Sequence, residues 1–273
     1  MRQLQRTQAL TWGWQCDGYL AFSTESIPQL GVINLTHVGD ESYDNMWQKV
    51  RSIWMYVYAH YLEEYDFFHL GGDDLFVLVA NLKKFLVPFL NQTDAVYLGQ
   101  WIPLPGSNDK YYVSGGPGYT LNQVALKRLV TEVLPKCRVG TRASYEDRLV
   151  SQCFREMNIT GGDTRNYDTG EQRYHDVGPS HLYTFRSTTT TTGGRGSFHA
   201  RTAAYWERLS FPNQSGIMVG PKHELQAADA YSVSFHDIYH PLYMARLHSI
   251  LYPETCPSTT PLGRALRYEQ GDC

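Results

Sequence analysis

Apolar residues recur every three or four positions between residues 42 and 64. This spacing is typical of an amphipathic helix, whose apolar stripe includes Val50, Ile53 and Val57. Ser42 stands where an N-cap is expected. Similar stripes predict four further helices, at residues 75–90, 121–134, 145–157 and 241–251.

Short apolar runs bounded by polar or glycine-rich stretches predict strands. They lie at residues 18–23, 66–70, 95–99, 111–113 and 231–235. Because these strands alternate with helices, the chain is predicted to be an α/β protein. We expect one domain over residues 1–273, with a mobile loop at 186–200, where Thr and Gly cluster, and an irregular tail at 254–273.

Composition excludes several classes of function. The chain has 273 residues and a net charge of −3, and no basic stripe that would favour a nucleic-acid partner. No segment approaches the roughly 18 apolar residues of a membrane span. Its 20 Tyr and 6 Trp would suit carbohydrate binding, although an aromatic-rich core explains them equally well.

Cysteines and glycosylation sequons bear on the compartment. The five cysteines show no zinc-site spacing, and an odd number leaves at least one without a partner in this chain. Four Asn-X-Ser/Thr sequons begin at Asn34, Asn91, Asn158 and Asn213, which favours a glycosylated protein of the secretory pathway.

The segment Gly71-Gly72-Asp73-Asp74 interrupts an apolar run. Two glycines let the backbone turn sharply and approach a ligand closely. Two carboxylates directly after a buried strand are costly unless a cation satisfies them, and a hard divalent ion is a suitable one. A carboxylate pair at a helix start is an equally common explanation of the same residues.

Three more segments carry candidate chemistry: Ser114-Gly115-Gly116 after a strand, Glu146-Asp147 at a helix start, and His236 at a strand end. In α/β sheets such turns can converge on one ligand. A manganese ion on a sugar nucleotide's diphosphate would suit Asp74 and His236, and Asp147 could be the general base for an acceptor hydroxyl. Singly, these residues are also explained by a turn, a helix cap or a structural histidine.

The order of these segments resembles a known family. Its Asp-Asp-Asp-Thr-Tyr-Val segment is similar to 72–77, its Ser-Gly-Gly-Ala-Gly-Tyr segment to 114–119, its Glu-Asp helix with a following Cys to 146–153, its Gly-Asp-Ser-Arg segment to 162–165 and its Val-Ser-Phe-His segment to 233–236. The likeness runs from about residue 12 to 252, and the family is the core 1 β1,3-galactosyltransferase branch of glycosyltransferase family thirty-one, related to Fringe.

The resemblance implies a GT-A fold for nucleotide-diphospho-sugars, with a mixed central sheet flanked by helices. It further implies inverting transfer of galactose from UDP-galactose to GalNAc on Ser/Thr of glycoproteins, in the Golgi lumen, by a type II membrane protein that could be a homodimer. Asp74 and His236 would bind Mn²⁺, Asp147 would be the base, and Cys137 and Cys153 would form a disulfide. Substrate would be bound by Asp73, Ser114, Gly115, Gly116, Glu146, Tyr205 and Trp206.

Three departures from the family pattern leave alternatives open. Gly72 stands where the family has its first Asp, and the Thr-rich stretch at 188–196 has no family counterpart. We also expect the chain to begin inside the family's first helix, without the first strand, its uridine-binding loop or the membrane anchor. The alternatives are a Fringe-like β1,3-N-acetylglucosaminyltransferase and an inactive relative that acts as a folding partner or glycan-binding module.

Overall fold

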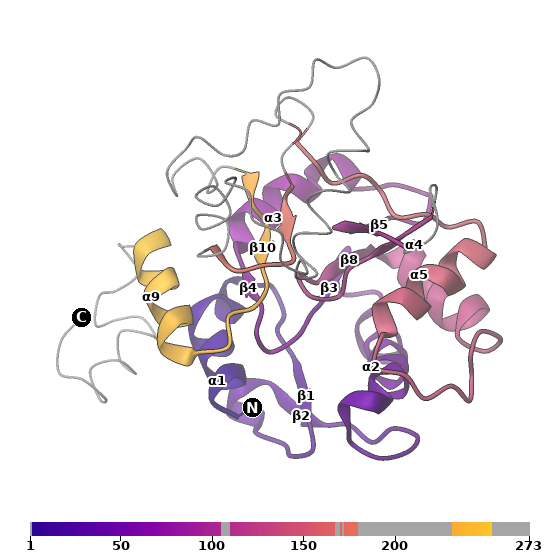
Figure 1. Cartoon of the computed structure of the whole chain (residues 1–273), viewed down its shortest axis with the longest axis horizontal. Helices are drawn as coiled ribbons and strands as arrows, with labels where there is room; N and C mark the ends of the chain where they lie inside the picture. Colours follow the sequence, from indigo (N-terminus) through magenta and orange to yellow (C-terminus); the bar gives the residue numbers. More distant parts are fainter. Residues whose placement is uncertain (1, 105–109, 167–169, 171, 180–230, 253–273) are drawn as a thin grey trace, which may run out of the picture.

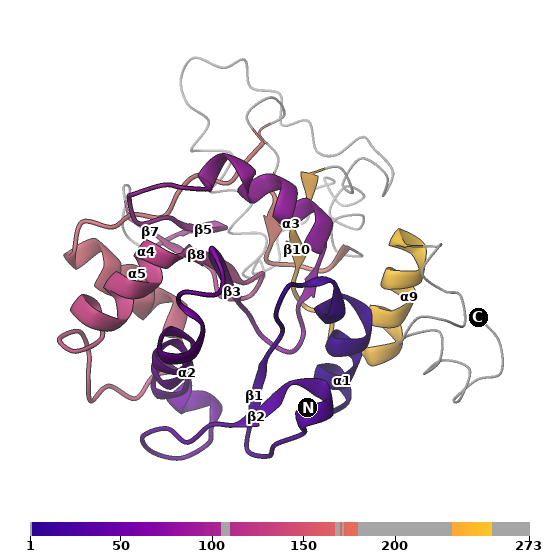
Figure 2. The ribbon, with the colours of Figure 1, turned by 180° about the vertical axis from the view of Figure 1, so that it is seen from behind.

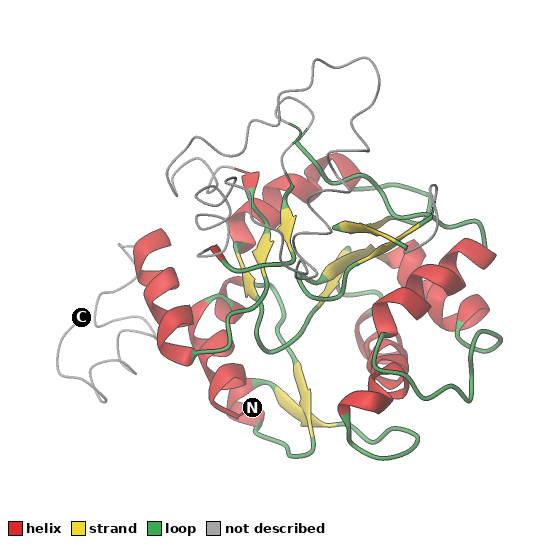
Figure 3. Ribbon diagram, in the orientation of Figure 1, coloured by secondary structure: helices red, strands yellow, loops and turns green. Residues whose placement is uncertain are grey.

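The computed structural model of this chain describes residues 2–104, 110–166, 170, 172–179 and 231–252. Helices and short strands alternate along these residues, and the helices surround the strands (Figures 1 and 3). The predicted α/β class is therefore confirmed. The predicted loop at 186–200, the tail at 254–273 and the residues Tyr205 and Trp206 lie outside the described residues.

The elements are short. The strands are β1 (Ala21–Ser23), β2 (Val32–Asn34), β3 (Phe67–Leu70), β4 (Phe76–Val77), β5 (Tyr97–Gly99), β6 (Trp101–Pro103), β7 (Tyr111–Val113), β8 (Tyr119–Asn122), β9 (Tyr174–His175) and β10 (Ser234–Phe235). The α-helices are α1 (Arg2–Thr11), α2 (Met46–Tyr61), α3 (Val79–Leu86), α4 (Gln123–Arg128), α5 (Glu146–Glu156) and α9 (Pro241–Leu251). Single turns of 3-10 helix lie at Gly13–Gln15, Pro28–Leu30, Tyr43–Asn45 and Val87–Phe89, and a π-helical turn, Leu129–Val133, follows α4.

Hydrogen bonding divides these strands into four small sheets, ordered β3-β8-β5, β4-β10-β9, β1-β2 and β6-β7. Both parallel and antiparallel pairs occur, as a mixed sheet requires. The single central sheet that was expected is not formed by the described strands. The turn between β3 and β4 separates the two strands into different sheets, so that β4 pairs with β10 while β3 pairs with β8.

Two strands lie where the sequence pattern predicts helix. The predicted helix 121–134 begins late, because Leu121 is completely buried in β8, between β3 and β5. Asn122 then caps α4, accepting a hydrogen bond from the N–H of Ala125 at 2.8 Å. The predicted helix 75–90 likewise opens with β4. Pairing with a neighbouring strand overrides the helical spacing in both places.

The remaining elements agree with the pattern, apart from small shifts of their ends. Strands are confirmed within 18–23, 66–70, 95–99, 111–113 and 231–235, and helices within 42–64, 145–157 and 241–251. Ser42 takes the N-cap position, as predicted, of the 3-10 turn that leads into α2, but its side chain makes no capping hydrogen bond. Its hydroxyl instead accepts a hydrogen bond from Arg142 at 3.2 Å.

Two apolar clusters form the core. The first lies between the sheet β3-β8-β5 and the helices α2, α4 and α5, and includes Trp47, Trp54 and Phe154. The second joins β4 and β10 to α1, α3 and α9, and includes Phe76 and Phe235. Figure 2 shows α1 and α9 side by side at one end of the molecule. Strand β4 and the end of β10 thus belong to the same apolar cluster as the N-terminal helix.

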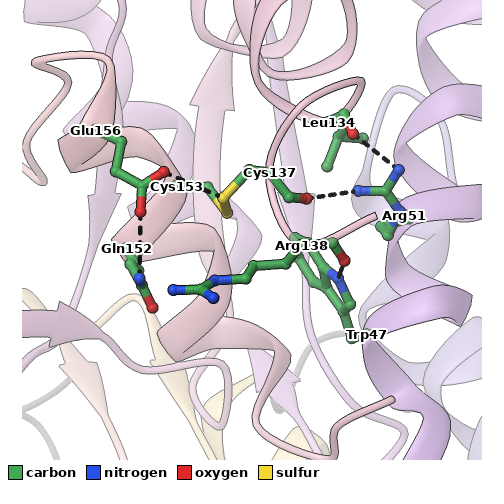
Figure 4. Close-up of a disulfide and its surroundings, with 8 residues drawn as sticks. All are labelled: Trp47, Arg51, Leu134, Cys137, Arg138, Gln152, Cys153 and Glu156. Carbon is green, nitrogen blue, oxygen red and sulfur yellow. Dashed lines mark hydrogen bonds between the residues drawn. A yellow bond between two sulfur atoms is a disulfide. The ribbon is translucent and has the colours of Figure 1, made fainter. Parts of the chain in front are cut away.

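A disulfide joins the start of the loop before α5 to α5 itself (Figure 4). Cys137 and Cys153 are both buried, and their pairing confirms the one that the resemblance implies. From α2, Trp47 donates to the carbonyl of Arg138 at 2.8 Å, and Arg51 donates to the carbonyls of Leu134 and Cys137. The segment on one side of the disulfide is therefore anchored to α2. Among the described helices, none has the length and apolar character that crossing a bilayer requires.

Candidate active site

The turn from Gly71 to Leu75 is held in place by the N-terminal helix. The side-chain amide of Gln8 donates to the carbonyls of Gly72 and Leu75, at 2.9 and 3.1 Å. The indole of Trp12 also donates to the Leu75 carbonyl, at 3.1 Å. These donors satisfy backbone carbonyls that no sheet partner satisfies, and so they fix the backbone that carries Asp73 and Asp74.

The structure brings Asp74 and His236 together, although 162 positions of sequence separate them. The N–H of Ile238 donates to the carbonyl of Asp74 at 2.9 Å, and the N–H of His236 donates to the carbonyl of His175 at 3.0 Å. As a result the Nε2 atom of His236 lies 3.2 Å from Oδ2 of Asp74. The two predicted metal ligands therefore face each other.

A third candidate ligand, Asp237, was missed by the sequence reasoning. Its carboxylate, that of Asp74 and a ring nitrogen of His236 all lie within 4.8 Å of one another. Asp237 has a left-handed backbone, with φ of 62°, a conformation that Asp adopts more readily than most residues. Its place directly after His236 was the only signal in the sequence. Tyr239, an exposed aromatic residue, donates to its Oδ1 at 2.7 Å.

Two carboxylates and an imidazole form a donor set that fits Mn²⁺ or a similar divalent cation. The charges of these groups also compensate one another. Burial disfavours the charged ring of His236, but the hydrogen bond to Asp74 and the negative charges of Asp74, Asp176 and Asp237 raise the pKa of His236 to about 9. Asp73 is not part of this cluster, and burial together with the neighbouring charge of Asp74 raises its pKa.

Gly72, which stands where the resembling family has its first Asp, lies against Asp74. A Cβ atom at Gly72 would come within 2.6 Å of Oδ1 of Asp74. A side chain at this position would therefore displace the Asp74 carboxylate from the place it now occupies.

The turn Ser114–Gly118, between β7 and β8, connects the metal candidates to the candidate base. The N–H of Gly115 donates to Oδ2 of Asp147 at 2.9 Å, and the N–H of Gly116 donates to the Ser114 hydroxyl at 3.3 Å. The hydroxyl of Ser234, in β10, donates to the carbonyl of Pro117 at 2.6 Å. One short turn thus touches α5 on one side and β10 on the other.

Glycine is needed in this turn because side chains from elsewhere occupy the space beside it. A Cβ atom at Gly115 would lie 2.7 Å from Oε1 of Glu146, and one at Gly116 would lie 2.7 Å from Nδ1 of His236. The space beside these two glycines is therefore occupied by the protein's own side chains and is not open to a sugar or phosphate. Their bare backbone admits the protein's own polar side chains. Whether Ser114, Gly115 and Gly116 contact substrate stays a prediction.

Glu146 and Asp147 open α5 but have different surroundings. Asp147 accepts hydrogen bonds from the backbone of Gly115 and, at 2.7 Å, from the N–H of Arg148. Burial raises its pKa, and these hydrogen bonds oppose the rise. Glu146 accepts from the Tyr119 hydroxyl at 3.3 Å, and burial, followed by the charge of Asp147, raises its pKa well above the usual range. Glu146 therefore points toward the core, where Tyr119 accepts a hydrogen bond from Trp54.

Asp176 is a further carboxylate in this site that the sequence reasoning missed. It follows β9 directly, and its Oδ1 accepts a hydrogen bond from the Ser114 hydroxyl at 2.8 Å. The same oxygen lies 3.7 Å from Nδ1 of His236. Burial raises the pKa of Asp176, whereas the Ser114 hydrogen bond and the charge of His236 lower it. No local pattern around residue 176 signals this role.

The sequence of this chain is similar to those of known proteins. The chain is 25% identical over 254 residues to glycoprotein-N-acetylgalactosamine 3-beta-galactosyltransferase 1 of Xenopus laevis, an alignment that covers 89% of this chain and 62% of that protein. It is 31% identical over 144 residues to chondroitin sulfate synthase 3 of Homo sapiens, covering 49% of this chain and 16% of that protein. No family model matches the chain.

These findings confirm the resemblance drawn from the ordered segments. They also agree with the predicted class of enzyme, since both relatives are glycosyltransferases. The chain spans less than two thirds of the length of either relative.

Proposed function

We propose, for a chain whose relatives are glycosyltransferases, that this protein is an inverting β1,3-galactosyltransferase with a GT-A fold. It would transfer galactose from UDP-galactose to GalNAc on Ser or Thr of glycoproteins, in the Golgi lumen. The observation that carries the proposal is the shared turn Ser114–Gly116. In this turn the N–H of Gly115 donates to the candidate base, Asp147, and Gly116 lies against the candidate metal ligand, His236.

The metal would be held by Asp74, His236 and Asp237. When bound there, a divalent cation such as Mn²⁺ neutralises charge on the diphosphate that leaves the sugar. The backbone beside the strands supports this assignment, because the N–H of Ile238, after β10, donates to the carbonyl of Asp74, before β4, and so holds the two ligand-bearing segments together.

Asp147 would accept the proton of the attacking acceptor hydroxyl. A general base works best when its pKa lies near the working pH, and burial shifts the pKa of Asp147 in that direction. The Gly115 N–H fixes Oδ2 of this carboxylate, which restricts the direction from which the hydroxyl can approach.

A lumenal location is supported by features of the described surface. Asn34, Asn91 and Asn158, which begin three of the four sequons, are exposed. The disulfide Cys137–Cys153 is also typical of an oxidising compartment. The fourth sequon, at Asn213, lies outside the described residues.

The test is a donor screen on the full chain. UDP release is measured with UDP-galactose and UDP-N-acetylglucosamine, with and without a GalNAc-peptide, in Mn²⁺ and in EDTA. We expect Mn²⁺-dependent release from UDP-galactose. Preference for UDP-N-acetylglucosamine would favour the Fringe-like alternative, and Mn²⁺-dependent UDP binding without transfer would favour the inactive relative.

Three variants assign the roles. Asp74→Ala and His236→Ala should each abolish Mn²⁺-dependent UDP binding, measured by titration calorimetry. Asp147→Asn should keep that binding and lose roughly 10²–10⁴-fold in transfer rate, because the amide keeps the shape but cannot take a proton. Normal transfer by Asp147→Asn would contradict the assignment of the base.

A further inference from the structure

We infer that Asp176 is a positioning residue, which holds the His236 ring so that Nε2 is presented to the metal. The inference rests on the proposed metal site and concerns a residue beside it. It starts from an asymmetry of the His236 ring, whose two nitrogens lie in different surroundings.

The two ring nitrogens of His236 differ in access. Nε2 lies 3.2 Å from the carboxylate of Asp74, one of the candidate ligands. Nδ1 is buried, has no hydrogen-bond partner among the residues that the structure describes, and faces the backbone of Gly116, where even a methyl group would approach it to 2.7 Å. Burial thus closes Nδ1 to a cation, whereas Nε2 faces a candidate ligand.

Asp176 faces the closed side of the ring and is itself firmly held. Its Oδ1, 3.7 Å from Nδ1, accepts the hydrogen bond from Ser114. Its backbone N–H donates to Oε1 of Gln100 at 2.7 Å, and Gln100 is buried. The carbonyl of Gln100 in turn accepts from the N–H of Ser114 at 2.8 Å. The carboxylate is thus tied to segments that come from neither β4 nor β10.

Asp237 also lies near Nδ1, with its Oδ1 at 3.5 Å, but it is suited to a different role. That oxygen already accepts from Tyr239, and Asp237 belongs to the cluster of candidate ligands. Asp237 is also the next residue after His236, so it moves with that segment. Asp176 comes from a distant segment and can fix the ring against the rest of the site.

This arrangement has a known physical effect. A carboxylate that accepts the N–H of one ring nitrogen sets the tautomer and orientation of the ring, and leaves the lone pair of the other nitrogen free for a metal. Loss of such a partner typically weakens metal binding 10- to 100-fold. The distance of 3.7 Å would shorten to a hydrogen bond with a small rotation of the ring.

The experiment measures Mn²⁺ affinity on the full chain in the presence of UDP, by electron paramagnetic resonance of free Mn²⁺. Asp176→Asn keeps the size of the side chain, and Asp176→Ala removes it. Asp94→Asn, at an exposed position in the loop before β5, is the matched control. We expect both Asp176 variants to bind Mn²⁺ 10- to 100-fold more weakly, and the control to bind it like the wild type.

A spectroscopic readout separates positioning from general stability. With ¹⁵N-labelled histidine, the nitrogen coupling to bound Mn²⁺ should be strong in the wild type and in Asp94→Asn, and reduced in Asp176→Ala at saturating metal. If the wild type binds Mn²⁺ and the Asp176 variants bind it equally tightly with unchanged coupling, only this inference is overturned, even if their melting temperatures fall. If the wild type binds no Mn²⁺, the metal of the proposed function is overturned together with the inference.

Discussion

At the scale of single residues, the site depends on its glycines, which have no side chain, as much as on its polar residues. Gly115 and Gly116 let Asp147, Glu146, Asp176 and His236 approach one turn of backbone from two sides. A methyl group at either position would collide with a polar side chain that has little room to move.

This crowding gives a direct prediction for Gly116→Ala. The new Cβ would displace the Asp176 carboxylate and the His236 ring, so the free energy of unfolding should fall by about 1–3 kcal/mol and Mn²⁺ binding should weaken. Gly140→Ala is the control, because nothing lies within 4 Å of a Cβ there. Urea unfolding measures the stability of the two variants, and titration measures their affinity for Mn²⁺. Equal stability of Gly116→Ala and Gly140→Ala would contradict the prediction that the space beside Gly116 is too crowded for a methyl group.

The sequence indicated some of these residues and not others, for a physical reason. Asp74, Asp147 and His236 each end or begin an element whose pattern is visible locally. Asp176 and Asp237 gain their role only through contacts with Ser114 and with His236, and the first of these contacts joins segments 62 positions apart. The pattern of neighbouring residues does not predict contacts between segments that are distant in the sequence.

At the scale of elements, the turn before β4 depends on α1. Gln8 supplies the hydrogen bonds to the carbonyls of Gly72 and Leu75, and it is buried. An acid-bearing turn is thus oriented by a helix that precedes it by more than 60 residues.

We therefore expect Gln8→Leu to destabilise the protein by roughly 1–3 kcal/mol, because the Gly72 carbonyl loses its donor and the Leu75 carbonyl keeps only Trp12. It should also weaken Mn²⁺ binding through movement of Asp74. Gln3→Leu, on the exposed face of the same helix, controls for the change in side-chain chemistry. Denaturation curves and Mn²⁺ titrations of the two variants measure this. Identical affinities for Mn²⁺ would mean that α1 does not orient the turn.

The elements that the pattern predicted wrongly share one cause. β8 is the central strand of its three-stranded sheet and β4 is an edge strand, but the side chains of both strands are buried. A strand buried on both faces needs no alternation of apolar and polar residues. Its continuous apolar sequence therefore cannot be distinguished from the start of the helix that follows. Longer elements with one exposed face, such as α2 and α5, were predicted because their exposed faces are polar.

At the scale of the whole molecule, buried histidines link stability to pH. His69 and His248 are histidines whose pKa burial lowers to about 4, and at His248 a backbone hydrogen bond with Thr11 opposes this shift. In the unfolded chain a histidine has a pKa of about 6.5. Between these values the unfolded state binds more protons, so the free energy of unfolding falls as the pH falls from about 6.5 to 4.

Each histidine should contribute roughly 2–3 kcal/mol to that fall, on the basis of 1.36 kcal/mol for each unit of pKa. The double variant His69→Gln/His248→Gln should lose less stability than the wild type between pH 7 and pH 4, measured by urea unfolding. His60→Gln, at an exposed position, controls for the loss of an imidazole. A double variant with the same pH dependence as the wild type would contradict this explanation.

The sheet β4-β10-β9 has a consequence for the order in which the protein can fold during its synthesis. All partners of β3-β8-β5 have been translated by residue 122, whereas β4 must wait for Ser234 and Phe235. At about 5–20 residues per second on the ribosome, that wait is on the order of ten to thirty seconds. During this time the edges of β4 stay open to other chains, so a chaperone that shields the nascent segment around Asp74 would act in that interval.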